Sequence, residues 1–274
     1  MKIYLLFIAF ILPVFSHQPI LTANSVTEVL NPNISKAYYS TLETRPQIYK
    51  ISSKKPFDLY VNILVPNIKD QKTSLFVEVI KKEKSNIPLS FLNGQTFNWT
   101  KFFEPFANDT YLMGPAFKRK VAKGEYEIKV SSPIHNIKYV LAIGELERFR
   151  FKETYKTINT VLEIKKSFFN KSPATFLFSI FGSIYILTII ILSFVFGFTY
   201  RYLLKKFAKS KLRKLSKNIN NSGRIIRFFI GVILFLIGIF TSWNPLYFFF
   251  SGFCFYEAIF SWCGVFAAVK KCSI

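Results

Sequence analysis

Three cysteines near the C-terminal end of the chain are the first residues to consider for chemistry. Cys254, Cys263 and Cys272 are nine residues apart, and the last two lie in the stretch SWCGVFAAVKKC. Metal sites and dithiol redox sites use close pairs such as Cys-x-x-Cys, which this spacing does not provide. We therefore predict that Cys254 is an ordinary apolar residue. Cys263 and Cys272 are candidate thiols for reaction or acylation, and we expect no disulfide between them.

The segment 17–152 contains no residue set that predicts catalysis. The Gly-x-Ser-x-Gly motif of a nucleophile elbow is absent from the sequence. His135 stands in a turn-like stretch with only scattered carboxylates around it, whereas a metal site needs several ligands. We therefore predict that the protein is not an enzyme and that it holds no metal and no cofactor.

An aromatic stretch, FNWTKFFEPFANDTYLMGP at residues 97–115, offers a different kind of site. Its rings can form an exposed platform for a sugar or a peptide, or they can fold back as a cap on the domain that carries them. The candidate platform residues are Trp99, Phe102, Phe103, Phe106 and Tyr111.

Charged and apolar residues are separated along the chain. Its 274 residues include 33 Phe and carry a formal net charge of +22. A nucleic-acid-binding protein would interleave basic and aromatic residues on one folded surface, and we see no such element, so we predict no nucleic-acid partner. The segregation instead predicts membrane segments with basic flanks.

Three transmembrane helices follow from the apolar runs. Residues 174–200 contain no charge, and a helix over 173–200 exceeds the roughly 30 Å hydrocarbon core. Residues 228–269 contain one charge in 42 residues, which suits two helices, over 224–243 and 246–269, joined by a turn that ends in Pro245.

Basic residues predict how these helices are oriented. The segment 201–217 holds eight Lys or Arg and no acid, so the loop 201–223 is expected in the cytoplasm, together with the tail 270–274. The segment 201–217 either lies on anionic lipid of the inner leaflet or is a solvated loop that only sets the topology.

Glu257 is the one charge inside the apolar runs. An intramembrane carboxylate is costly, and no second ionisable residue is expected at its depth. We therefore expect a structural residue bonded to Ser251, Tyr256 or a partner chain, with a proton or cation contact as the alternative. Arg224 and Arg227 share one helical face at the membrane rim, where they can bind lipid phosphates or the carbonyl ends of a neighbouring helix.

The segment NINNSGRIIRFFIG at residues 218–231, followed by two apolar helices, resembles the inner-membrane YgaP-like transmembrane domain family. This family is a two-helix hairpin of unknown function. The matching positions are Asn218, Arg224, Arg227, Gly231, Cys263 and Cys272. The departures are Gly223 in place of an Asp, Gly264 in place of a Pro and Phe266 in place of a Tyr.

Residues 17–172 are predicted to lie on the extracytoplasmic side. Residues 1–16 have the layout of a secretory signal peptide, with an uncleaved anchor as the alternative. Six segments alternate apolar and polar residues or are rich in β-branched and aromatic residues, which predicts an antiparallel sandwich over 17–152. They are 37–42, 47–51, 57–65, 74–80, 125–131 and 138–143.

Gly124-Glu125-Tyr126 and Lys138-Tyr139-Val140-Leu141 resemble bacterial exported sandwich modules of the pre-peptidase C-terminal type. This resemblance implies a fold more than a function. Residues 153–172 place apolar side chains on one helical side and are predicted to form a stalk between the sandwich and the membrane.

The fold class is thus an exported all-β antiparallel sandwich plus three transmembrane α-helices, in a multi-pass protein of the plasma or inner membrane. The predicted function is that of a membrane-anchored envelope protein that binds or assembles with another molecule. Its predicted partners are the lipid bilayer and either further copies of the chain or another membrane protein. The alternative is a subunit of an oligomeric transporter or channel, with Glu257 and the arginine pair along its path.

Overall fold

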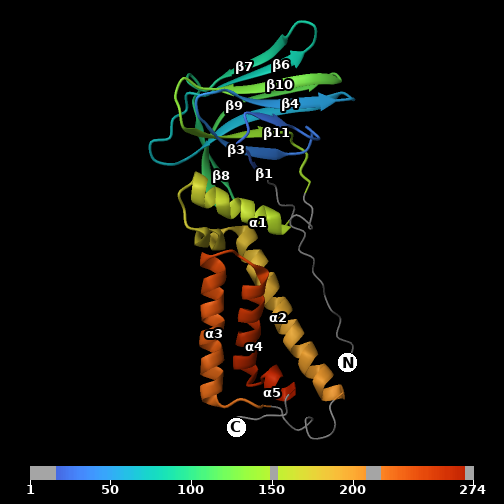
Figure 1. Cartoon of the computed structure of the whole chain (residues 1–274), viewed down its shortest axis with the longest axis vertical. Helices are drawn as coiled ribbons and strands as arrows, with labels where there is room; N and C mark the ends of the chain where they lie inside the picture. The colour runs from blue at the N-terminus through green and yellow to red at the C-terminus, as the bar shows by residue number, and fades with distance from the viewer. Residues whose placement is uncertain (1–16, 149–153, 208–216, 269–274) are drawn as a thin grey trace. The chain divides into compact units, whose positions relative to one another are not determined.

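The computed structural model describes residues 17–148, 154–207 and 217–268. The chain divides into two compact units (Figure 1), a sandwich unit that ends at Asn170 and a helical unit that begins at Lys171. The predicted signal peptide 1–16 and the predicted tail 270–274, with Cys272, lie outside the described residues.

The sandwich unit contains two β-sheets. The first has the strand order β1-β3-β11-β5-β9-β8 and the second the order β2-β4-β10-β6-β7. The strands are β1 (Gln18–Leu21), β2 (Val26–Glu28), β3 (Lys36–Leu42), β4 (Gln47–Ser53), β5 (Phe57–Pro66), β6 (Phe76–Lys82), β7 (Ile87–Asn93), β8 (Thr100–Glu104), β9 (Asp109–Val121), β10 (Gly124–Ser131) and β11 (Ile137–Ile143). The all-β region with two sheets is therefore confirmed, and each of the six predicted segments coincides with one strand to within a few residues.

Two strand pairs correct the prediction that the sandwich is antiparallel. β1 pairs with β3 in parallel, and β2 pairs with β4 in parallel. Between β1 and β3 the chain visits the other sheet to form β2, and between β2 and β4 it visits the first sheet to form β3. Such crossover connections allow parallel neighbours, whereas a tight hairpin joins only antiparallel ones.

Alternating residues of both sheets build the core between them. On β5, Leu59, Val61 and Ile63 are fully buried, as their spacing of two predicts. They pack with Tyr49 of β4 and Ile128 of β10 in one cluster. The outer face of the first sheet is also covered, by the helical segment that follows β11.

That segment consists of α1 (Thr154–Glu163) and the π-helical turn η2 (Ile164–Phe168). It falls in the range 153–172, for which a stalk was predicted. Ile164 and Phe168 are buried, and they join Tyr39 and Tyr111 in a second apolar cluster on the first sheet. In the described part of the chain, this segment therefore belongs to the packed sandwich unit.

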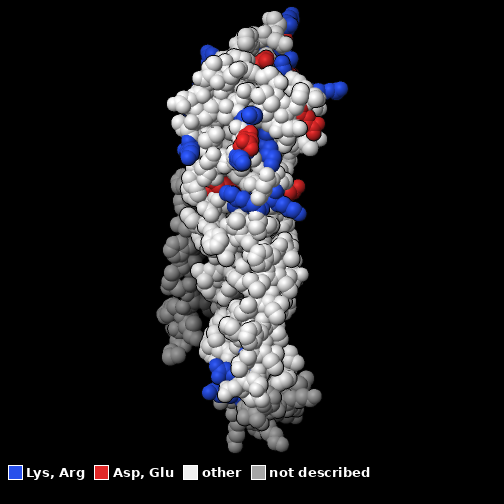
Figure 2. All heavy atoms as spheres, turned by 90° about the vertical axis from the view of Figure 1, so that its left-hand side faces the viewer, with Lys and Arg blue, Asp and Glu red and all other residues white. Residues whose placement is uncertain are grey.

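The helical unit contains four α-helices and one 3₁₀ turn. They are η3 (Pro173–Phe178), α2 (Ile180–Phe207), α3 (Asn221–Phe240), α4 (Pro245–Phe260) and α5 (Gly264–Ala268). By length and composition, Ile180–Lys206 and Asn221–Phe240 can each cross a membrane, while Pro245–Phe260 is a shorter apolar helix. Figure 2 shows one face on which the described side chains are uncharged over a long stretch of these helices.

The first predicted span, 173–200, begins later and ends later than expected. Ser172 caps the 3₁₀ turn η3, and its hydroxyl accepts a hydrogen bond from the Ala174 amide. Ser179 then takes an extended conformation and caps α2 through the Gly182 amide at 2.9 Å. The helix continues to Phe207, into the segment 201–217 that was assigned to a loop.

The third predicted span, 246–269, is wrong in its extent. α4 has 16 residues, about 24 Å of helix, which is less than the roughly 30 Å of a hydrocarbon core. It ends at Ser261, which has a left-handed backbone conformation, and a new helix, α5, begins at Gly264. Among the described residues, two helices long enough to cross a membrane and one shorter apolar helix are thus found where three spans were predicted.

Close packing joins α4 to α3. A Cβ atom on Gly231 would lie 2.8 Å from the ring of Phe255, and one on Gly238 would lie 2.8 Å from the ring of Phe248. These two glycines of α3 thus let α4 of the same chain approach closely.

Candidate functional sites

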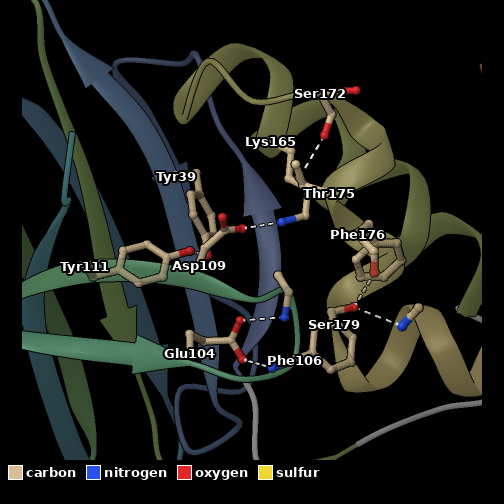
Figure 3. Close-up of polar contacts among 12 residues, drawn as sticks. Tyr39, Glu104, Phe106, Asp109, Tyr111, Lys165, Ser172, Thr175, Phe176 and Ser179 are labelled. Carbon is tan, nitrogen blue, oxygen red and sulfur yellow. Dashed lines mark hydrogen bonds and ion pairs between the residues drawn. The ribbon is translucent and has the colours of Figure 1, made fainter. Parts of the chain in front are cut away.

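A buried ion pair joins the helical turn η2 to strand β9 in the sandwich unit. Lys165 Nζ lies 2.9 Å from Asp109 Oδ2, and both side chains are fully buried (Figure 3). The residues are 56 positions apart in the sequence. Buried charges are costly unless they are paired, so this contact fixes where the helical segment lies on the sheet.

Glu104, at the end of β8, is a third charged residue in this cluster. Its two carboxylate oxygens accept hydrogen bonds from the amides of Phe106 and Ala107, both at 2.8 Å (Figure 3). Burial raises the pKa of Glu104 to about 6, although the two amide bonds and the Lys165 charge act in the opposite direction. Glu104 therefore closes the β8–β9 turn and titrates in the mildly acidic range.

Two tyrosines complete the cluster. The hydroxyls of Tyr39 and Tyr111 lie 2.7 Å apart and are buried. Burial raises the pKa of both phenols well above the usual value, so both remain neutral. A cavity of about 50 Å³ lies beside them and is lined by His17 and Phe102 among others. This volume is well below the ~300–1,000 Å³ that is typical of small-molecule sites.

The sequence does not reveal this cluster because its members come from three segments that are far apart in the chain, namely β3, the β8–β9 hairpin and η2. One signal was available, namely that Lys165 follows Ile158 by seven residues and Val161 by four. It therefore lies on the apolar side of the predicted helix. A lysine on such a face needs a buried partner. No group of three or more His, Cys, Asp or Glu that can hold a metal ion is found among the described residues.

A second polar cluster lies in the helical unit, where α3 meets the break between α4 and α5. Arg227 Nε donates to Glu257 Oε2 at 2.9 Å, and the Gly264 amide donates to Glu257 Oε1 at 2.9 Å. Arg227 Nη1 also donates to the Gly223 carbonyl at 3.0 Å. Both carboxylate oxygens of Glu257 are thus bonded within the chain.

The residues around this pair fix the backbone of the break. The Asn218 side-chain amide donates to the Cys263 carbonyl at 3.0 Å, and its oxygen accepts the Cys263 amide at 2.7 Å. Arg224 Nε donates to the Ala258 carbonyl at 2.8 Å. Helix ends leave backbone groups without intrahelical partners, and in an apolar environment these side chains satisfy them.

In the described residues neither Ser251 nor Tyr256 bonds the Glu257 carboxylate, although such a bond was predicted, and the alternative of a partner chain stays a prediction. Ser251 donates to the Gly231 carbonyl at 2.8 Å, and Glu257 bonds to Arg227 and Gly264. The assumption that no second ionisable residue reaches this depth also fails, because the long arginine side chain extends along α3 to the carboxylate. Of the two contacts expected for Arg224, the structure contains the one to a helix carbonyl.

The five aromatic candidates do not form a single platform. Phe106 and Tyr111 are buried, and Trp99 packs against Gly94 and Gly114 with its indole N–H bonded to the Gly94 carbonyl at 2.6 Å. Phe102 and Phe103 are exposed. The buried members thus fold back on the sandwich unit, which is the second of the two predicted arrangements, and ligand binding at Phe102 and Phe103 stays a prediction.

Of the two candidate thiols, Cys263 and Cys272, only Cys263 lies in the described residues. Cys263 is buried at the α4–α5 break and Cys254 is partly buried on α4. The segment 201–217, proposed to contact anionic lipid, is described only in part, since residues 208–216 lie outside the described ranges.

The segment that contains the second cluster matches a known family. Residues 215–273 match the model of a family described as "Inner membrane protein YgaP-like, transmembrane domain". This segment is similar to that domain. This match confirms the resemblance that was predicted from the arginine, glycine and cysteine positions. With the apolar helices, it supports a location in the membrane and contact with the lipid bilayer. A search of curated proteins gives no match.

Solved structures give only distant likenesses. The pre-peptidase C-terminal domain of a collagenase from Bacillus anthracis is 7% identical, with a TM-score of 0.28, over 43% of this chain and 92% of that one. A β-glucosidase from Paenibacillus barengoltzii is 12% identical, with a TM-score of 0.23, over 48% of this chain and 13% of that one. The first is of the type that the sequence resembles, but TM-scores this low support no conclusion about function.

Proposed function

We propose that the protein is a membrane-anchored assembly module. Its sandwich unit faces the extracytoplasmic side and binds a protein or a glycan. Its helices hold it in the membrane, where they associate with other copies of the chain or with a membrane partner. The coarser part of this proposal, a membrane protein with a β-sandwich region, rests on the family match and on the two-sheet fold.

One observation favours assembly over transport: the charged groups of Arg224, Arg227 and Glu257 are already bonded within the chain. Glu257 is 6% exposed, and each of its oxygens accepts a hydrogen bond. A carboxylate that carries protons or cations along a path must exchange its partners. Glu257 instead connects α3 to the α4–α5 break through two fixed hydrogen bonds. Such a connection suits a structural role.

The outward faces of the helices supply the surface for association. Large apolar side chains of α3 are exposed, and they include Ile226, Phe229, Ile233, Leu236 and Phe240. Lipid covers such a face equally well, so apolarity alone does not select a protein partner. The proposal therefore depends on a direct test of association.

The test is mild-detergent purification of the full chain, followed by crosslinking mass spectrometry of the proteins that co-purify. We expect crosslinks between copies of the chain or to one reproducible membrane protein. A monomer without reproducible crosslinks would contradict the assembly role.

Liposome flux with Glu257 intact and with Glu257→Gln distinguishes transport from assembly. The assembly role predicts no flux in either sample, together with weaker association in the variant. Flux that disappears in the variant while association stays normal would favour the transporter alternative.

A further inference from the structure

A cleft in the sandwich unit, which shares Tyr39 with the first polar cluster but none of its charged residues, remains without a role. It has a volume of about 690 Å³, which lies within the ~300–1,000 Å³ of small-molecule sites. Its walls come from the β1–β2 connection, the end of β3 with the β3–β4 turn, and the helical segment α1–η2. The lining residues are Leu21, Thr22, Ala23, Ser25, Tyr39, Ser40, Thr41, Glu43, Thr44, Arg45, Gln47, Glu163, Ser167 and Phe168.

Three charged side chains of this cleft have no partner in the described part of the chain. Glu43, Arg45 and Glu163 are exposed, and neither a hydrogen bond nor an ion pair engages their charged groups. The carboxylates of Glu104 and Asp109, in contrast, are bonded within the protein. The carboxylates of Glu43 and Glu163 can therefore accept hydrogen bonds from a ligand in the cleft, and the guanidinium of Arg45 can donate up to five.

Hydroxyl groups form much of the remaining lining. Ser40 donates its hydroxyl to the Thr22 carbonyl at 2.8 Å, so its oxygen still has free acceptor capacity. At the base of the cleft, the rings of Tyr39 and Phe168 meet edge to face with centroids 5.3 Å apart. Polar and apolar surfaces are therefore both present, as a ligand with hydroxyl groups around a carbon ring requires.

We propose that this cleft binds an oligosaccharide, held between the β3–β4 turn and the helical segment. Carboxylate, guanidinium and hydroxyl groups together bond sugar hydroxyls as both donors and acceptors. A lipid or an apolar molecule would leave these groups unpaired, which costs free energy. The inference rests on the proposed binding role of the sandwich unit and identifies the glycan as the ligand class.

The position of the cleft links such binding to the helical segment. Glu163, Ser167 and Phe168 supply one wall, and the Asp109–Lys165 ion pair fixes that wall on the first sheet. A bound sugar that contacts both walls adds interactions between the β3–β4 turn and η2. Binding should therefore slow amide hydrogen exchange in residues 154–168.

The experiment uses the full chain in detergent micelles and three probes, namely cellotetraose, maltotetraose and the tetramer of N-acetylglucosamine. Saturation-transfer NMR measures binding, at sugar concentrations up to about 10 mM because single sugar sites are weak. The variants are Arg45→Ala and Glu163→Gln, with Arg119→Ala, an exposed arginine on β9 away from the cleft, as the matched control. Near-UV circular dichroism establishes that each variant is folded.

The expected result is that at least one tetrasaccharide binds and that each cleft variant weakens binding about tenfold or more. Arg119→Ala should bind like the unmodified chain. Absence of binding by all three sugars to folded protein, or binding that the cleft variants leave unchanged, would overturn the inference. The crosslinking test of assembly, carried out on the same preparation, would still decide the proposed function in that case.

Discussion

In the described residues, each unit has an ion pair that is largely shielded from solvent, and the two pairs differ in what surrounds them. Asp109–Lys165 and Arg227–Glu257 have the same N–O distance of 2.9 Å. The first pair is fully buried, whereas the side chains of the second are 16% and 8% exposed. The first pair joins a helical turn to a strand. The second also holds backbone groups at a helix break.

This difference determines which of the two ion pairs can be replaced by apolar residues. Asp109 and Lys165 lie beside an apolar cluster of the first sheet, so side chains of similar volume can fill their place. Glu257 accepts the amide of Gly264, and Arg227 donates to the carbonyl of Gly223. An apolar residue in place of Glu257 would leave the Gly264 amide without this acceptor in an environment without water.

The largest expected effect comes from breaking the sandwich pair on one side. Asp109→Ala leaves Lys165 buried without its carboxylate, and we expect a loss of about 3–5 kcal/mol in the free energy of unfolding. Thermal unfolding of the full chain in detergent, followed by near-UV circular dichroism, measures the change.

Two further variants sharpen this test. Replacing both partners, as in Asp109→Leu with Lys165→Met, should restore most of the lost stability, because no unpaired charge remains. Lys166→Met, at the exposed neighbouring lysine, should change little. If the double variant is as unstable as Asp109→Ala, the apolar cluster cannot substitute for the pair, and the contrast with the helical unit is lost.

The sequence predicts most of the strands from alternation or from residue type. Leu59, Val61 and Ile63 alternate on β5, whereas the other predicted strands, β3, β4, β6, β10 and β11, are identified by their content of β-branched and aromatic residues. β1 and β2 are short and pair in parallel through crossovers. Such pairings depend on the tertiary path of the chain, and local periodicity contains no information about that path.

The membrane site was only partly predictable for a related reason. Arg224, Arg227 and Glu257 were identified because charges next to apolar runs are conspicuous. Their pairing requires that α3 and α4 pack closely and that α4 ends at Ser261. That end lies inside a continuous apolar run, with Asn218 and Glu257 as the residues that satisfy it. Hydropathy alone contains no signal for it.

Glu257→Leu should have the next largest effect, and it tests the helical side of the comparison. The change removes the acceptor for Arg227 and for the Gly264 amide, and hydrogen bonds to charged groups contribute about 1.5–3 kcal/mol. Glu257→Gln keeps a carbonyl acceptor and should lose less. Unfolding of the full chain in mixed micelles, with a rising fraction of a denaturing detergent, measures the loss of stability in both variants. Equal losses would mean that charge, and not acceptor capacity, stabilises the break.

Acidity should affect the sandwich unit through Glu104. Because burial raises its folded-state pKa from the usual 4.5 to about 6, the folded state holds more protons than the unfolded state between these values. This group's contribution to stability is therefore fully present below about pH 4.5 and falls by about 2 kcal/mol as the pH rises through 6.

The comparison of Glu104→Gln with the unmodified chain isolates this effect. The variant should lack the part of the pH slope between about 4.5 and 6 that Glu104 contributes. Glu125→Gln, at an exposed glutamate on β10, serves as the control and should keep the slope. An unchanged slope in Glu104→Gln would show that the residue titrates normally.

The smallest expected effect distinguishes buried from exposed members of the aromatic stretch. Tyr111→Phe removes the hydroxyl that bonds Tyr39 at 2.7 Å and leaves the Tyr39 hydroxyl buried with one partner fewer, at a cost of about 1 kcal/mol. Phe103→Ala, at an exposed ring of β8, should change the free energy of unfolding by less than about 0.5 kcal/mol. The same thermal unfolding assay measures both. A larger loss for Phe103→Ala than for Tyr111→Phe would mean that the exposed ring contacts another molecule or another copy of the chain. That result would restore a binding role to this part of the aromatic stretch and would direct the crosslinking experiment to the edge strand β8.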